Sequence, residues 1–420
     1  MHFALRCYYP PVRGPKYGVS PWMDRSRPAA RSSFPAFRGE RTASVVVIGG
    51  GLTGVMSAYA CAAAGLDVVL LEAERLGSGG SGRASGVIAA DGADSFRAIE
   101  QASGRRVARV HFEQARQAAL DLAATVKRLR IRSDFAVADG VRVVPVGADP
   151  APWIREADAR REAGLDGRWL KPGPAAAATG VADVSGGLRL SRWATCHPYR
   201  LVLGFAAAAA SRGAAIHERS PVTRVTFTRT QARVVTAGGA ITTTAVLHCT
   251  GEPTALAGAL RRHARPMTRG LALTAPLGAA MRKAVGTVAV VVTDVHDPPH
   301  VVRWIDGPAA LVSGAEAPRP RTAQPASLDV QRTGQLMYEL SLLYPAISGV
   351  PPAFGWSMPV GRTPDGGLVA GPHRNFPHQY FAFGTEHDPA RAFLASRLLL
   401  RHVRGEATAD DDRLGFARCL

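Results

Sequence analysis

The sequence predicts an α/β protein in which a Rossmann-like domain is interleaved with an antiparallel-sheet α+β domain. Three observations support this fold class. A strand, a glycine-rich turn, a helix and a second strand follow one another without interruption between residues 44 and 72, which is the order of a parallel βαβ unit. Alternating apolar segments between Leu271 and Leu311, including 288–292 and 300–305, favour an antiparallel sheet. Strand and helix patterns return from residue 197 and near the C-terminal end, so the second layer interrupts the first twice.

The glycine-rich turn has the spacing of a dinucleotide-binding fingerprint. Gly49, Gly51 and Gly54 form G-x-G-x-x-G directly after the apolar run 44–48, and a helix is expected over 55–65. Such glycines turn the chain tightly and let a diphosphate approach backbone N–H groups at a helix start. The next strand, 67–71, ends at Glu72, where a carboxylate can bind ribose hydroxyls. A purely structural glycine turn is the alternative, but the strand, helix, second strand and acid follow in the order and spacing of a dinucleotide site.

The bulk composition is that of an ordinary globular protein. The 420 residues are 46% hydrophobic and 20% charged, with a formal net charge of +18. The excess is arginine scattered along the whole chain, and the only lysines are Lys16, Lys127, Lys171 and Lys283. Because no long basic run is present, the charge predicts a solvated surface, and nucleic-acid binding is disfavoured.

The cysteines and the first residues bear on the compartment. The five cysteines form no C-x-x-C pair, and Cys61 and Cys249 fall inside a predicted helix and strand. This pattern favours a reducing compartment and no structural metal. No signal-peptide core precedes residue 44, and no apolar run approaches the roughly 20 residues of a membrane span. We therefore expect a cytoplasmic protein without a membrane span. No sequence feature specifies an oligomeric state.

The remaining elements are predicted from periodicity and turn chemistry. Residues 1–43 are expected to form an extended arm anchored by Tyr9, Tyr17 and Trp22, or to be disordered. Further along the chain we expect a loop at 77–86, a mostly helical stretch at 96–130, strands at 135–137 and 141–146 around a turn at Asp139-Gly140, alanine- and proline-rich linking sequence up to 194, a helix at 199–212, strands at 215–217, 222–227 and 245–249, and a helix at 328–343. The last helix is expected to begin at Asp388 and Pro389 and to end at Gly405.

Four separated segments carry a family resemblance. They are Ser20-Pro21-Trp22 with the fingerprint 47–54, residues 71–73 with 77–83, residues 197–200 through 218–222, and residues 363–366 with 371–372, 381–384 and the last helix. In this order they resemble the D-amino-acid-oxidase-like FAD-dependent oxidoreductases, which include glycine and sarcosine oxidases, and especially the gamma-glutamylputrescine-oxidase-like branch. The resemblance spans nearly the whole chain. With the element pattern, it gives an expected division into an arm (1–43), a discontinuous FAD-binding domain (44–130, 195–262 and 354–412), a substrate domain (131–194 and 263–353) and a tail (413–420).

The resemblance implies FAD as the cofactor and assigns residues to it. The diphosphate falls to the fingerprint residues Gly49, Gly51, Leu52, Thr53 and Gly54, the adenosine ribose to Glu72 with Ala73, the adenine to the backbone of Val222, and the diphosphate and flavin further to Ser81, Gly82, Arg83, Thr250, Gly251 and Gly384. Some relatives attach the flavin through a cysteine in the stretch matching 356–362 or a histidine in the loop after Glu72. Neither residue is present here, so noncovalent FAD is expected.

The implied chemistry removes a hydride from a carbon that bears an amine, giving an imine that water hydrolyses. Arg269 is a candidate partner for the carboxylate of a small amine or amino-acid substrate, and the alternative is an arginine that holds the seam between domains. His387 is a candidate acid/base or substrate-orienting group, and a solvated or structural histidine is the alternative. His300 and Arg303, on opposite faces of one strand, and Trp356, which equally suits the core, are weaker candidates.

The turn from Gly384 to Arg391 departs from the family pattern. Glu386 and Asp388 bring two carboxylates into a turn that is glycine-rich in relatives. If either faced the flavin, its charge would oppose reduction. If Asp388 caps the helix and Glu386 points to water, the turn has no such effect. This departure motivates an alternative function, a flavin-binding protein with a degenerate active site and a structural or partner-dependent role. The positive charge alone motivates a third, a tRNA-modifying flavoenzyme. The absence of lysine between 285 and 304 weakens oxygen as the electron acceptor.

Overall fold

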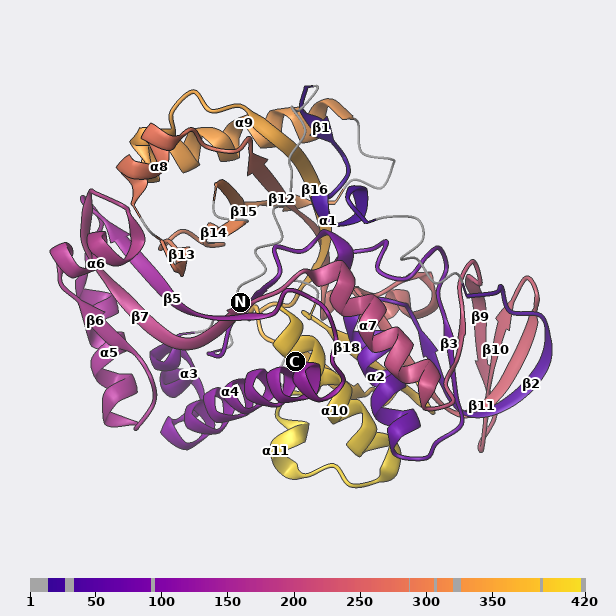
Figure 1. Ribbon diagram of the computed structural model, residues 1–420. Coiled ribbons are helices and arrows are strands. Elements are labelled where there is room, and N and C mark those ends of the chain that lie inside the picture. Colours follow the sequence, from indigo (N-terminus) through magenta and orange to yellow (C-terminus); the bar gives the residue numbers. More distant parts are fainter. Residues whose placement is uncertain are drawn as a thin grey trace.

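Two β-sheets form the framework of the protein (Figure 1). The computed structural model describes residues 14–26, 34–91, 95–286, 288–305, 308–319, 326–385 and 388–416. An eight-stranded sheet lies on the right of Figure 1, and a ten-stranded sheet lies on the left and top, with α9 and α8 above it. These two sheets establish the mixed α/β fold class that the sequence predicts.

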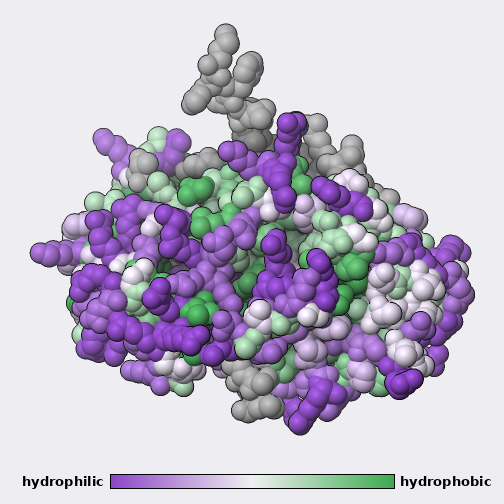
Figure 2. Space-filling view, turned by 90° about the horizontal axis from the view of Figure 1, so that it is seen from below, coloured by the Kyte–Doolittle hydropathy of each residue, from purple (hydrophilic) through white to green (hydrophobic). Residues whose placement is uncertain are grey.

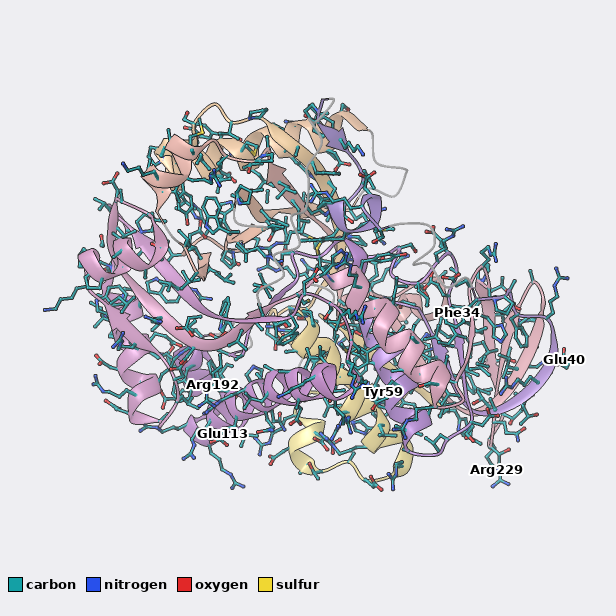
Figure 3. The ribbon with its side chains drawn as sticks, viewed as in Figure 1. Phe34, Glu40, Tyr59, Glu113, Arg192 and Arg229 are labelled. Atoms are coloured by element: carbon teal, nitrogen blue, oxygen red, sulfur yellow. The ribbon has the colours of Figure 1, made fainter. Side chains whose placement is uncertain are left out.

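The eight-stranded sheet is built around the predicted βαβ unit. Its order is β17-β18-β11-β2-β3-β8, and the pairs from β18 to β8 are parallel. The strands are β2 (Gly39–Ile48), β3 (Val68–Leu71), β8 (Ala215–His217), β11 (Gly239–Gly251), β17 (Val369–Pro372) and β18 (Gln379–Phe383), with the hairpin β9 (Val222–Phe227) and β10 (Ala232–Thr236) attached through β11. Glu40 and Arg229 mark the outer end of this sheet (Figure 3).

Helices cover one face of this sheet and the hairpin covers the other. Val45 and Val47 pack with α2 (Leu52–Ala63), α7 (Pro198–Ser211) and α10 (Pro389–Arg404) in one apolar cluster. Val46 and Ile48 point the opposite way and pack against β10. Because β2 is buried on both faces, its inner half has the continuous apolar run of a parallel strand.

The ten-stranded sheet is mostly antiparallel, as the alternating segments predicted. Its order is β1-β16-β12-β15-β14-β13-β5-β7-β4, and only the pairs β1–β16 and β13–β5 are parallel. The strands are β1 (Lys16–Tyr17), β4 (Val87–Ile88), β5 (Ala136–Pro145), β6 (Arg168–Leu170, beside β7), β7 (Val184–Thr195), β12 (Arg265–Thr274), β13 (Val290–Thr293), β14 (Val301–Ile305), β15 (Ala309–Pro318) and β16 (Pro352–Arg362).

The other helices lie around the ten-stranded sheet or connect it to the eight-stranded sheet. They are α1 (Pro21–Asp24), α3 (Phe96–Ser103), α4 (Arg105–Arg128), α5 (Ala151–Glu162), α6 (Pro172–Thr179), α8 (Ala279–Val285), α9 (Ala326–Leu343) and α11 (Ala409–Asp412), with short 3-10 turns η2 (Ser81–Arg83), η3 (Ala255–Arg262) and η4 (Pro345–Ile347). Leu336 and Leu340 of α9 pack on Val292 and Val312 of the sheet. Within the described part of the chain, no helix combines the length and apolar character that a membrane crossing requires. Figure 2 shows hydrophilic side chains over most of the face seen from below.

The arm before the first predicted strand is anchored as expected at Trp22. This side chain is buried and its Nε1 donates to the carbonyl oxygen of Ala84 at 2.9 Å. Ser20 caps α1, and its hydroxyl donates to the carbonyl oxygen of Gly82 at 2.7 Å. Tyr9 lies outside the described residues. These bonds place the arm directly against the loop that follows β3.

Two predictions about local structure are wrong. Asp139-Gly140 is not a turn, because both residues belong to the single long strand β5. The glycine is needed for packing, since a Cβ at Gly140 would lie 2.7 Å from the ring of Trp193, and Asp139 pairs with Arg189 on β7. The sequence from 147 to 194 is not a linker but contains α5, β6, α6 and β7, whose alanine-rich composition disguised them. The stretch 96–130 is mostly helical, as predicted, and consists of α3 and α4 separated only at Gly104, where φ is +84°.

The sheets also divide the chain differently from the expected domain boundaries. Strand β16 pairs with β12 in the ten-stranded sheet, although residues 354–412 were expected in the FAD-binding domain. Likewise β2 begins at Gly39, inside the expected arm, and β4 belongs to the ten-stranded sheet. The chain therefore crosses between the sheets more often than composition alone indicated.

Candidate active site between the two sheets

The glycine fingerprint forms a turn that leaves no room for larger residues. A Cβ at Gly54 would lie 1.8 Å from the carbonyl oxygen of Gly49, and one at Gly49 would lie 2.6 Å from that of Cys249. Gly49 also has φ of +108°, a conformation that favours glycine. Leu52 and Thr53 are the first two residues of α2, so this turn delivers the chain directly to the positive end of a helix.

Glu72 lies at the end of β3 with its carboxylate over this turn. One oxygen accepts the N–H of Gly50 at 2.6 Å and the other accepts the N–H of Glu74 at 2.8 Å. Burial raises the pKa of Glu72, and the two backbone bonds oppose that rise. A carboxylate has about four lone-pair positions, so two remain for ligand hydroxyls. Ala73 is exposed beside it.

The segment that leads to Val222 lies next to Glu72. The N–H of Ser220 donates to the carbonyl oxygen of Glu72 at 2.8 Å, and that of Arg219 donates to the carbonyl oxygen of Glu74 at 2.8 Å. Val222 follows as the first residue of β9. The structure thus brings the predicted ribose and adenine positions together at one edge of the glycine turn.

The loop after β3 returns to the start of α2. The Ser81 hydroxyl accepts the N–H of Leu52 at 2.9 Å, and Gly82 packs closely on Tyr199. The Arg83 guanidinium contacts the carbonyl oxygens of Ser78, Gly18 and Ser357 at 3.2–3.4 Å. Ser81 therefore faces the fingerprint, while the Arg83 side chain ties the loop to the arm and to β16.

The two helix starts of the site lie side by side. Thr53 of α2 and Thr385, just before α10, join their hydroxyls at 2.8 Å. Thr250 and Gly251 end β11 next to Cys249, whose carbonyl oxygen faces Gly49. One extended ligand can therefore reach both the α2 turn and the region of α10.

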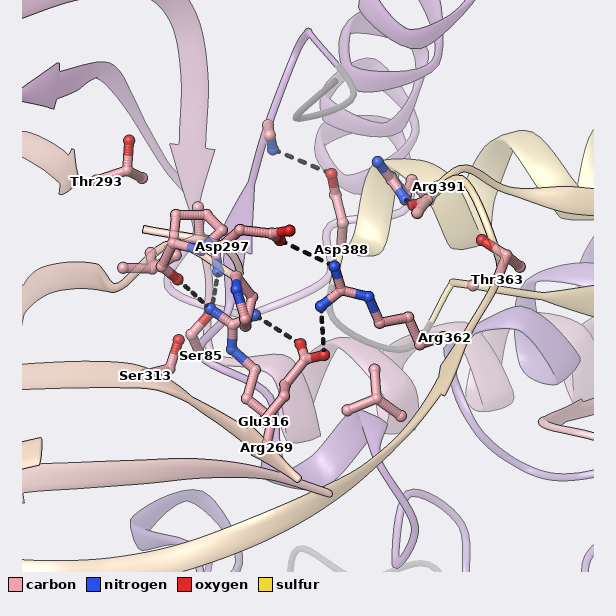
Figure 4. A pocket seen from close by; sticks show the side chains of 18 of the residues that line it. Ser85, Arg269, Thr293, Asp297, Ser313, Glu316, Arg362, Thr363, Asp388 and Arg391 are labelled. Atoms are coloured by element: carbon pink, nitrogen blue, oxygen red, sulfur yellow. Dashed lines mark hydrogen bonds and ion pairs between the residues drawn. The ribbon is translucent and has the colours of Figure 1, made fainter. Parts of the chain in front are cut away.

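A cavity of about 400 Å³ begins at α10 and extends to the ten-stranded sheet (Figure 4). Gly384, Asp388 and Arg391 line it from the α10 side. Its other walls are formed by Ser85, Val87 and Ala89 near β4, Arg142 and Trp193 on β5 and β7, Thr293 and residues 297–299 after β13, Arg269, Ser313 and Glu316 on β12 and β15, and Met358 with residues 360–366 from β16 onward.

The carboxylate of Asp388 is buried at the cavity wall. It caps α10 by accepting the N–H of Ala390 at 2.8 Å, and its second oxygen accepts the N–H of Ala89 at 3.3 Å. Burial raises its pKa to about 6, and the Arg391 charge opposes that rise. Asp388 therefore caps α10, as one interpretation of the sequence expected, and its side chain also lines the cavity.

Arg269 lies in the cavity wall and is already engaged in an ionic network. Its Nη1 lies 2.9 Å from Glu316, and its Nη2 donates to the carbonyl oxygen of Pro299 at 2.5 Å. Glu316 also binds Arg362 at 3.0 Å, and Arg362 reaches Asp297 at 2.9 Å (Figure 4). Burial lowers the pKa of the Arg269 guanidinium, and the Glu316 charge opposes that effect. Arg269 thus lines the cavity, as a partner for a substrate carboxylate would, and it also makes the bridging contacts of a structural arginine.

The other candidates fall in different places. His387 and Glu386 lie outside the described residues. Trp356 is fully buried and its Nε1 donates to the carbonyl oxygen of Arg83 at 2.8 Å, so it is a core residue. Arg303 donates from one nitrogen to the carbonyl oxygens of Ser85, Gly86 and Cys196 at 2.9–3.0 Å, which fixes the strand along the cavity.

Sequence reasoning missed several cavity residues. Arg142 lies on β5, which was read as two strands around a turn, and its guanidinium stacks on Trp153. Glu316 and Arg362 come from strands whose neighbours in space are distant in sequence. The alternation of side chains along each strand could have pointed to these two residues. The pairing of β12 with β15 and β16 was needed to bring them together.

The geometry of this turn fits an FAD molecule. The close backbone approaches at Gly49 and Gly54 hold the turn tight, beside a helix start and an acid with free acceptor positions. Comparison with known proteins agrees, since residues 44–396 match the DAO family of FAD dependent oxidoreductases. The chain belongs to this family. It is therefore an FAD-dependent oxidoreductase, an enzyme whose cofactor is FAD.

Relatives within and around this family agree in sequence and fold. The chain is 32% identical over 209 residues to gamma-glutamylputrescine oxidoreductase of Escherichia coli, a match that spans about half of each protein (48% of this chain and 47% of that one). It is 26% identical over 355 residues to the probable oxidoreductase OrdL of Rhizobium meliloti, covering 81% of this chain and 78% of that one. Glycine oxidase from Geobacillus kaustophilus has a similar fold, with a TM-score of 0.74 and 19% identity over 88% of this chain and 96% of that chain.

Proposed function

We propose that this FAD-dependent oxidoreductase oxidises the C–N bond of a small amine or amino acid and binds its FAD noncovalently. The observation that carries the proposal is the cavity of about 400 Å³ that joins the start of α10 to an arginine-containing wall. A cavity of this volume suits a small substrate. The names of gamma-glutamylputrescine oxidoreductase and glycine oxidase support the same substrate class.

Each part of the FAD site has an assigned role in this proposal. The backbone from Gly49 to Gly54 with Ser81, Gly82 and Thr250, Gly251 holds the diphosphate, and Glu72 with Ala73 holds the ribose. The backbone of Val222 meets the adenine, and Gly384 lies at the flavin. When bound, the flavin supplies the hydride acceptor. No cysteine occurs between Trp356 and Arg362, along the cavity wall, which supports noncovalent binding.

The protein's own side chains orient the substrate. Arg269, with its charge partly neutralised by Glu316, contacts a substrate carboxylate and aligns the reacting C–H bond. Asp388 lies on the α10 side of the cavity, and with its pKa raised to about 6 it is mostly ionised near neutral pH. It can therefore accept a proton from an ammonium substrate, which must lose its proton before hydride leaves. His387 keeps the acid/base role as a second candidate.

Anaerobic mixing of the FAD-loaded protein with a panel of amines and amino acids tests this proposal. Bleaching of the visible flavin band by a panel member, followed by release of the corresponding carbonyl product, is the expected result. Arg269→Lys is the matched variant, and it should retain FAD but need more substrate for the same bleaching rate.

The contrary outcome is equally informative. If dithionite bleaches the flavin but no amine does, the protein binds FAD without oxidising amines. The alternative of a flavin-binding protein with a degenerate active site then gains support, with the Asp388 carboxylate opposing flavin reduction as its physical basis.

A further inference from the structure

Three potential metal ligands cluster behind the cavity wall, in the loop between β13 and β14. Asp294 comes directly after β13, and His296 and His300 follow in the same loop. Their ligand atoms all lie within 4.8 Å of one another. The histidine Nδ1 atoms approach the same Asp294 oxygen at 2.7 Å and 2.6 Å. Two imidazole nitrogens and one carboxylate oxygen, all directed at one point, are a donor set that suits divalent transition metals.

The ligands are held in place by contacts that do not use the converging atoms. The other oxygen of Asp294 accepts the N–H groups of His296 and His300 at 3.2 Å and 2.8 Å. The His300 ring packs against β15 at Gly314, where a Cβ would lie 2.3 Å from the ring. Asp294 is 1% exposed and His300 9% exposed, so both are enclosed by the fold. The carboxylate and one imidazole are therefore preorganised for a ligand.

A carboxylate on a neighbouring helix completes the arrangement. Glu339 of α9 lies 2.7 Å from His300 Nε2, the ring nitrogen that faces away from Asp294. Metal-binding histidines usually donate their second N–H to a carboxylate or carbonyl, which orients the ring and strengthens it as a ligand. Asp294 and Glu339 together also carry two negative charges, which match a divalent cation.

The third ligand provides access from solvent. His296 is 64% exposed, while Asp294 and His300 are almost fully enclosed. The present N–O separations of 2.6–2.7 Å correspond to hydrogen bonds, whereas tetrahedral zinc ligands lie roughly 3.3 Å apart. An ion therefore replaces both hydrogen-bonded protons when each imidazole nitrogen moves about 0.6 Å farther from the Asp294 oxygen, on this ligand geometry.

We propose that Asp294, His296 and His300 form a binding site for one Zn²⁺ ion, oriented by Glu339, that clamps the wall of the substrate cavity. The same loop carries Asp297, which pairs with Arg362, and Pro299, whose carbonyl oxygen accepts from Arg269 (Figure 4). Zinc links the two ends of the loop and thereby fixes both arginine contacts. The site is distinct from the FAD site and does not depend on the substrate class proposed above.

Zinc binding to the FAD-loaded, tag-free protein is measured by competition with a chromogenic chelator. Cys7 and Cys419 are replaced by serine in every sample, because free thiols bind zinc. We expect one equivalent of Zn²⁺ at low micromolar affinity or better. Co²⁺ in the same site should give the visible absorption of a cobalt ion with imidazole ligands, a readout that needs no enzyme activity.

Two variants and one control localise the ion. His296→Ala removes a mostly exposed ligand, leaves the fold intact and should weaken zinc binding at least tenfold. Glu339→Gln should weaken it roughly tenfold, and by less than His296→Ala does. His111→Ala on α4, a histidine outside the cluster, should bind zinc like the parent. The proposal is overturned if the parent binds no zinc at micromolar concentrations, or if His296→Ala binds it as tightly as the parent.

Discussion

Replacing Asp388 by asparagine tests whether burial of the ionised carboxylate lowers the stability of the folded protein. The ordinary pKa of this group is 3.8, and burial raises it to about 6. Because the pKa of Asp388 is higher in the folded state, its contribution to the free energy of unfolding is fully present below pH 3.8. This contribution is lost as the pH rises through about 6. Above that pH the ionised, buried carboxylate opposes folding. Asparagine keeps the side-chain oxygen that caps α10 but has no such charge.

The size of the effect follows from the two pKa values. A difference of about 2 units at 1.36 kcal/mol each corresponds to about 3 kcal/mol. A chain of this length has an unfolding entropy of about 0.9 kcal/mol per kelvin, so the Tm difference between Asp388→Asn and the parent should grow by about 3 °C across this pH range. The variant should become relatively more stable as the pH rises.

Thermal unfolding of the FAD-free proteins at pH 3.5, 6 and 7.5 gives this difference directly. Asp149→Asn is the matched control, because Asp149 also accepts a backbone N–H near a helix start but is exposed. A Tm difference that does not change with pH, or one that shifts in favour of the parent as the pH rises, would refute the burial argument for Asp388.

Three further predictions concern the ligand sites. Gly54→Ala should reduce FAD affinity at least tenfold, because the new Cβ would lie 1.8 Å from the Gly49 carbonyl oxygen. Gly79→Ala is the control and should leave FAD affinity unchanged, because the space around its Cβ is open. Flavin fluorescence measures the affinity of both variants. Glu72→Gln should weaken FAD binding roughly tenfold through the loss of a charged acceptor, on the scale of about 1.5 kcal/mol for such a bond; equal affinities would exclude Glu72 from the ribose site. Arg269→Ala should raise KM for a carboxylate-bearing substrate tenfold or more, with a smaller effect on amines that lack a carboxylate; a uniform change across both classes would assign Arg269 to structure.

The elements predicted with greatest accuracy are those whose signals are local. The apolar run before Gly49, the spacing to Gly54 and the acid at Glu72 are all found in β2, α2 and β3. The last helix begins at Pro389 with Asp388 as its cap and ends at Gly405, where φ is +69°. In these segments, turn geometry, capping and burial are each decided by residues within a few positions of one another.

Where the prediction failed, a distant residue determined the local structure. Gly140 follows an aspartate and satisfies the sequence rule for a turn, yet the ring of Trp193 on the neighbouring strand requires a glycine in extended conformation there. The expectation of no structural metal rested on cysteine spacing and stays a prediction. Glu339, which completes the cluster around Asp294, comes from a helix that the sequence could not place beside that loop.

The sequence by itself determined the family, the cofactor and the dinucleotide turn, because each is encoded in short segments whose backbone geometry depends on glycine or on burial. Only the tertiary structure decided which charged side chains share the cavity. Arg269, Glu316 and Arg362 come from three strands, and their separations depend on strand pairing. Electrostatic interactions fall off with distance in space rather than in sequence, so the charge of the site exists only in the folded chain.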